Sequence, residues 1–137
     1  MERWNSAYLS GLTRMASSCA AGIGPSYVDA DFFRREGFPA AFAARYGTEL
    51  GPLVPESDSL ETVLGQWMGD RQVAERLMHW VRLSLGSPGQ VYRPADGDLV
   101  NRLDSAEDRC VPFFFLEDLI FADFPEGIAC FLIGNDE

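Results

Sequence analysis

Lysine is absent from this chain of 137 residues, so all eleven basic residues are arginine, and histidine occurs only once. Because 21 residues are Asp or Glu, the formal net charge is −10. Nucleic-acid binding requires a basic stripe that neutralises phosphates, and anionic membrane surfaces attract basic segments. The composition therefore argues against both classes, and we expect no nucleic-acid partner and no membrane partner.

Cysteine is also scarce: Cys19, Cys110 and Cys130 lie far apart and form no C-x-x-C pair. An odd number of widely spaced cysteines is typical of reduced thiols in a cytoplasmic protein. No apolar run approaches the roughly 18 residues that a membrane helix needs, and the first residues lack the apolar core of a signal peptide. We therefore expect a cytoplasmic protein in which Cys130, inside an apolar run, is a small core residue.

Motifs for cofactors and metals are missing as well. The G-x-G of Gly22 and Gly24 follows no predicted strand and lacks the third glycine of a dinucleotide-binding loop. The carboxylates between Asp96 and Asp108 do not follow the EF-hand spacing, and the single histidine supports no zinc site. We therefore expect no cofactor, no metal and no catalytic residue, so an enzyme is the less favoured interpretation.

Helical patterns fill residues 3–86. Apolar residues recur at helical spacing over 3–21, 38–46, 60–68 and 71–85. Ser59 or Asp58 would cap the helix over 60–68, and Asp70 would cap the helix over 71–85. In the helix over 71–85 we expect Leu77, Trp80 and Val81 to face the core.

Two further segments of this half receive predictions. A short helix is predicted to begin at Asp29 or Asp31, which would cap it, and to end at Gly37. The glycine and prolines of residues 51–58 predict a loop.

Strand patterns fill residues 90–134. Residues 90–93 predict a short strand, and two apolar runs flank a hairpin turn at Pro125-Glu126-Gly127, where Gly127 would supply a left-handed residue. This segregation predicts a single α+β domain over residues 1–137, with its helical part over about 3–86 and its strand-rich part over about 90–134. We expect the helical N-terminal two-thirds to pack on one face of a small antiparallel sheet formed by the C-terminal third.

The dipeptide Glu117-Asp118 interrupts an otherwise apolar segment of this sheet. Consecutive strand residues point to opposite faces, so a strand buried on both faces would bury a carboxylate, which is costly without a partner. Three explanations remain open. The dipeptide marks a bulge or break, an arginine pairs with a carboxylate inside the fold, or the strand borders a cleft that holds a functional site.

Five residues are candidates for a binding site: Tyr92, Arg93, Glu117, Asp118 and His79. A general base needs a pocket and a nucleophile within hydrogen-bond reach, and the sequence around His79 indicates neither. We therefore expect His79 to be a solvated histidine paired with Glu75, one helical turn before it.

Three classes of function agree with these observations. The preferred class is a small acidic cytoplasmic binding or accessory protein without catalytic activity, including an immunity- or inhibitor-type protein whose basic partner the acidic surface would attract. The first alternative is a ligand-binding or enzymatic domain with a pocket between helices and sheet. The second is a self-associating module, such as a homodimer formed through a sheet edge.

Overall fold

The computed structural model describes residues 2–19, 26–104 and 115–135. The helices are α1 (Glu2–Cys19), α2 (Phe38–Tyr46), α3 (Leu60–Met68), α4 (Arg71–Leu85) and α5 (Leu99–Asp104). The strands are β1 (Ser26–Phe33), β2 (Leu53–Glu56), β3 (Val91–Pro94), β4 (Phe115–Phe124) and β5 (Gly127–Asn135). Cys110, the G-x-G at 22–24 and the first apolar residues of the C-terminal segment lie outside the described residues.

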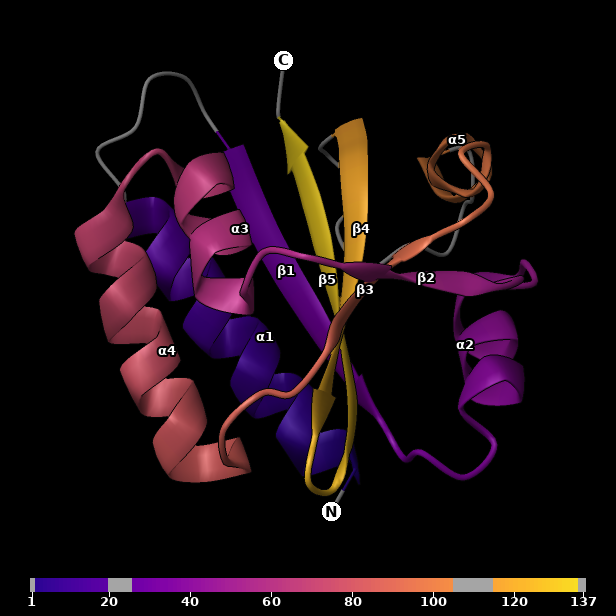
Figure 1. Cartoon of the computed structure of the whole chain (residues 1–137), viewed down its shortest axis with the longest axis horizontal. Coiled ribbons are helices and arrows are strands. Elements are labelled where there is room, and N and C mark those ends of the chain that lie inside the picture. Colours follow the sequence, from indigo (N-terminus) through magenta and orange to yellow (C-terminus); the bar gives the residue numbers. More distant parts are fainter. Residues whose placement is uncertain (1, 20–25, 105–114, 136–137) are drawn as a thin grey trace.

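The strands form one antiparallel sheet in the order β1-β5-β4-β3-β2. Figure 1 shows this sheet between two helical layers, with α1, α3 and α4 on one side and α2 and α5 on the other. The predicted α+β class and the antiparallel sheet are confirmed. The prediction that the helices pack on only one face of the sheet is wrong. Strands β4 and β5 carry apolar side chains on both faces, and burying both requires a layer on each side.

Strand β1 occupies the segment for which a short helix was predicted, so that prediction is wrong. Val28, Ala30 and Phe32 are buried in the same core cluster, at every second position. This period of two is the strand pattern. Strand β5 pairs with β1 from Ser26 to Phe33, and this complete antiparallel ladder outweighs the preference of aspartate for a helix cap. Strand β2 likewise forms inside the predicted loop over 51–58, so strands are not confined to residues 90–134.

Local capping signals place α3 and α4 where the sequence predicts them. The Ser59 side chain accepts a hydrogen bond from the Thr62 N–H, and the Asp70 side chain accepts one from the Val73 N–H. Each bond satisfies a donor that the first helical turn leaves unpaired. The predicted bounds of both helices, 60–68 and 71–85, are confirmed.

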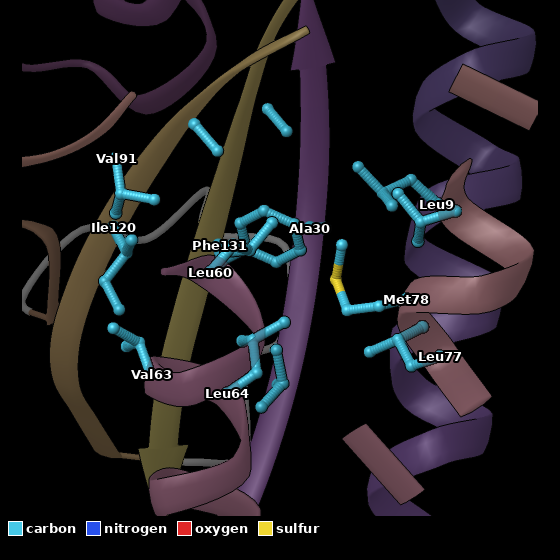
Figure 2. Packing of buried hydrophobic residues seen from close by; sticks show 14 of the residues in the cluster. Leu9, Ala30, Leu60, Val63, Leu64, Leu77, Met78, Val91, Ile120 and Phe131 are labelled. Carbon is cyan, nitrogen blue, oxygen red and sulfur yellow. The ribbon is translucent and has the colours of Figure 1, made fainter. Parts of the chain in front are cut away.

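Two hydrophobic cores lie on the two faces of the sheet. The larger one joins the sheet to α1, α3 and α4, and Figure 2 shows members of this cluster from the strands, such as Ile120 and Phe131, together with Leu60 of α3 and Met78 of α4. The smaller one joins the sheet to α2 and α5 and is rich in aromatic rings, with Phe121 of β4 in edge contact with Phe42 of α2. The interior position of β4 and β5 explains why both strands are apolar on both faces.

The β4–β5 hairpin is tighter than the sequence predicts. Phe124 pairs with Gly127, so the turn holds only Pro125 and Glu126. Gly127 is not among the described glycines with a left-handed backbone, and that part of the prediction is wrong. A Cβ at this position would lie 2.2 Å from the Phe33 carbonyl oxygen, so close approach of the neighbouring strand requires the glycine.

Among the helices that the structure describes, none combines the length and hydropathy needed to span a bilayer.

Candidate functional site

A β-bulge at Glu117 explains how charge enters the C-terminal segment. Leu116 pairs with Gly134 and Asp118 pairs with Ile133, so Glu117 is an extra residue in β4. The extra residue shifts the alternation of β4, which places Leu116 in the smaller core and leaves Glu117 exposed. The predicted bulge is confirmed, but β4 continues through it and is not split into two strands.

Arg93 of β3 neutralises the carboxylate that the bulge directs inward. Its guanidinium forms an ion pair with Asp118, and its Nε lies 3.0 Å from Glu56 Oε2 of β2. Trp67 Nε1 of α3 donates to Asp118 Oδ2 at 3.2 Å, and the Leu119 N–H donates to Asp118 Oδ1 at 2.8 Å. The predicted arginine–carboxylate pair is therefore confirmed, and its carboxylate is fully engaged by three neighbouring groups.

The electrostatics of this cluster favour the charged state of Arg93. Burial alone would lower the pKa of the guanidinium, but hydrogen bonds and charge interactions with Asp118 and then Glu56 outweigh it, so the pKa is raised. The side chains of Arg93, Asp118 and Glu56 are 32%, 17% and 21% exposed. The cluster therefore joins β2, β3, β4 and α3 as a partly buried structural network.

Tyr92 belongs to the opposite face of the sheet. It packs against the smaller core, and its hydroxyl donates to Asp123 Oδ2 at 3.3 Å. Burial raises the pKa of this hydroxyl, and the neighbouring negative charge of Asp123 raises it further. The structure thus places Tyr92, Arg93, Glu117 and Asp118 on two adjacent strands, but it separates Tyr92 from Arg93 by the thickness of the sheet.

His79 lies on the exposed face of α4, a different element from the other four candidates. Its ring contacts Trp80 edge-on, with centroids 5.7 Å apart. Glu75 forms its ion pair with Arg71, not with His79, so the predicted His79–Glu75 pair is wrong. Arg71 and His79 each lie four residues from Glu75 on the helix, and the permanently charged guanidinium is the stronger partner for a carboxylate.

A stripe of serines along α1 covers the free edge of β1. Ser6 Oγ donates to the Phe32 carbonyl and accepts from the Phe32 N–H, at 3.0 and 2.8 Å. Ser17 Oγ makes the same two kinds of bond with Val28, at 3.4 and 2.9 Å. Two backbone positions that β5 leaves unpaired are thereby satisfied, and β1 is closed to pairing with another chain.

A cavity lies beside this edge. It has a volume of about 710 Å³ and is lined by residues of α1, β1 and α2. Asp29, whose side chain is 2% exposed, accepts from Ser10 and from Arg14, the latter at 2.8 Å. Asp31 accepts from the Tyr46 hydroxyl and lies 3.6 Å from the Arg45 guanidinium.

The polar side chains that line this cavity stabilise the edge strand β1. Each of its two carboxylates already has a cationic partner and a hydroxyl partner, and the serines bond to backbone or to Asp29. A buried carboxylate is stable only when paired in this way. None of the five sequence candidates lines the cavity. The missed signal was the alternation of apolar and polar residues over 26–33.

The described residues contain no cluster of side chains that could bind a metal ion. No three histidine, cysteine, aspartate or glutamate side chains lie close enough together there to hold a metal ion.

Exposed apolar side chains form a surface between α1 and α4. Trp80 is 54% exposed, so the prediction that it faces the core is wrong. The buried face of α4 is turned by about one residue from the predicted one and is made of Ala74, Leu77, Met78, Val81 and Leu85. Met15 of α1 is also exposed, at 59%. A groove of about 190 Å³ lies here, lined by Leu12, Met15, Ala16, Val73, Leu77 and Trp80.

Charge is distributed unevenly between this helical pair and the rest of the chain. Helices α1 and α4 hold five arginines and two glutamates, a net charge of +3. The remaining six arginines and 19 carboxylates give the rest of the chain a net charge of −13.

Comparisons with protein-family models, curated proteins and solved structures found no match to this chain.

Proposed function

We propose that this protein is a small acidic binding or accessory domain that recognises a basic protein partner. The observation that carries the proposal is the charge segregation, with a net −13 outside α1 and α4. Surface potentials of one sign accelerate the capture of a partner of the opposite sign. Neutralisation of a basic protein, as by an immunity- or inhibitor-type protein, is one function of this kind, and it needs no catalytic residue.

The β-bulge supports a role for Glu117 in this binding. The neighbouring Asp118 is neutralised by Arg93, but Glu117 is exposed and forms no ion pair among the described residues. Bulges re-aim side chains at the rims of sheets. Glu117 therefore presents an exposed carboxylate at the surface at this end of β4.

The proposal is tested with a fluorescent, lysine-rich peptide as a basic probe. Binding measured by fluorescence anisotropy should weaken at least about tenfold between about 50 and 500 mM salt, because exposed charges are screened. Glu117→Gln should weaken binding more than Glu75→Gln. Both variants change the net charge equally, but Glu75 lies on the positively charged α4. A complex that is insensitive to salt, or equal effects of the two variants, would remove the proposal.

A further inference from the structure

The groove between α1 and α4 has the form of a binding site for a third helix. The two helices run antiparallel, since Ser84 at the end of α4 bonds Tyr8 near the start of α1 at 2.8 Å. They are neighbours in the helical layer that Figure 1 shows on one side of the sheet. Two packed helices leave a groove into which the ridge of another helix fits. Leu12, Val73 and Leu77 give this groove an apolar lining.

Trp80 and Met15 have the character of binding anchors. Both line the groove and are more than half exposed, although each has a large apolar side chain. Exposed apolar residues that occur singly need no explanation, but clustered ones mark interaction sites. Tryptophan is also among the residues enriched at the energetic centres of interfaces.

The charge around the groove selects the sign of the partner. Arg76 is exposed and is the one charged residue among those described as lining the groove. It belongs to the helical pair that carries +3 in a chain of −10. A partner with carboxylates beside its apolar face would be attracted here, whereas a basic partner would be repelled.

We propose that this groove binds an amphipathic helix of a partner protein, with an apolar stripe at helical spacing flanked by acidic residues. Apolar side chains at i, i+3, i+4 and i+7 would pack between Trp80 and Met15. A second copy of this chain fits less well, because a symmetric contact would bring the cationic helical pair against its own copy. This site is separate from the acidic surface proposed for the basic partner.

The test uses a fluorescent peptide of about 20 residues, long enough to form a helix, with leucines at this spacing and glutamates on both flanks. We expect saturable binding in fluorescence anisotropy, and Trp80→Ala and Met15→Glu should each weaken it at least about tenfold. Gln72→Ala, at an exposed position of α4 that does not line the groove, is the matched control and should change affinity less than about twofold. Circular dichroism melts verify that each variant folds.

Dependence of binding on peptide charge distinguishes a specific site from nonspecific hydrophobic binding. Arg76→Glu should weaken binding of the glutamate peptide about tenfold and strengthen binding of a peptide with lysine in place of each glutamate. Arg71→Glu makes the same charge change on α4 outside the groove and should have a much smaller effect. Absence of saturable binding, equal binding of both peptides, or no loss on Trp80→Ala would overturn the proposal. A dimer in sedimentation that Trp80→Ala dissociates would assign the groove to a second copy instead.

Discussion

Single side chains in this protein are fixed by partners that lie far away in the sequence. Asp118 is held by Arg93, 25 residues earlier, and by Trp67, 51 residues earlier. Asp29 is likewise held by Ser10 and Arg14 of α1. Each buried carboxylate therefore ties together elements that the chain forms separately.

We expect Arg93→Met to lower the free energy of unfolding by about 1–3 kcal/mol, because it leaves the partly buried Asp118 without its cation. Urea denaturation measures the change. Arg71→Met, which breaks an exposed pair with Glu75, is the control and should cost less than about 1 kcal/mol. Equal costs for the two variants would show that the Arg93 cluster contributes no more than a surface ion pair.

Tyr92 makes stability depend on pH in the alkaline range. Burial and Asp123 raise its native pKa above the unfolded value of about 10. Its contribution is therefore complete below about pH 10 and is lost as the pH rises through the native pKa. The free energy of unfolding should fall more steeply above about pH 10 in the wild type than in Tyr92→Phe, as measured by denaturant unfolding. Parallel pH dependences of the two proteins would contradict this assignment.

At the scale of elements, α1 acts as a cover for the edge of the sheet. Its serines replace the strand that β1 lacks on its outer side, at Phe32 and at Val28. The opposite edge is β2, which has only four residues and contains Pro55. A short strand with proline is a poor template for pairing. The edges of the sheet are therefore unfavourable surfaces for self-association.

We expect Ser17→Ala to lower the free energy of unfolding by about 1–3 kcal/mol, since it leaves the Val28 N–H and carbonyl buried without a partner. Ser18→Ala is the matched control, because Ser18 is exposed and donates a hydrogen bond to the Met15 carbonyl within α1, and it should stay within about 0.5 kcal/mol of wild type. Hydrogen exchange should quicken at Val28 in the first variant. Unchanged exchange there would mean that Ser17 does not protect the edge.

The whole molecule depends on a sheet that is buried on both faces. Strand β4 directs Phe121 into the core with α2 and α5, and strand β5 directs Phe131 into the core with α1, α3 and α4. Both rings are completely buried. The sheet thus couples the two helical layers, and loss of packing on either face should destabilise the entire fold.

Phe121→Ala and Phe131→Ala should each lower the free energy of unfolding by about 3–5 kcal/mol, because each removes a fully buried ring. Leu83→Ala, at a side chain that is 67% exposed, is the control and should change stability little. Chemical denaturation measures all three. A cost below about 1 kcal/mol for either phenylalanine would mean that its face of the sheet is not part of the cooperative core.

Much of the fold could be predicted because its signals are local. The bounds of α3 and α4 follow from helical periodicity together with caps at Ser59 and Asp70, all within one or two turns of chain. The prediction failed at β1, where Asp29 and Asp31 suit a helix cap locally but also fit a strand once β5 pairs with it. The phase of α4 was also misplaced, because Trp80 and Met78 have similar apolar character and only packing selects between them.

The sequence by itself determined the acidic character, the α+β class, the main helices and the burial of the C-terminal hairpin, since composition and short-range periodicity suffice for these. Only the tertiary structure decided that Glu117 is extruded by a bulge, that Asp118 pairs with Arg93, and that Trp80 is exposed beside a groove. Each of these outcomes depends on contacts between segments remote in the sequence. Such contacts are strong enough to override local conformational preferences, but they produce no periodic pattern in the sequence.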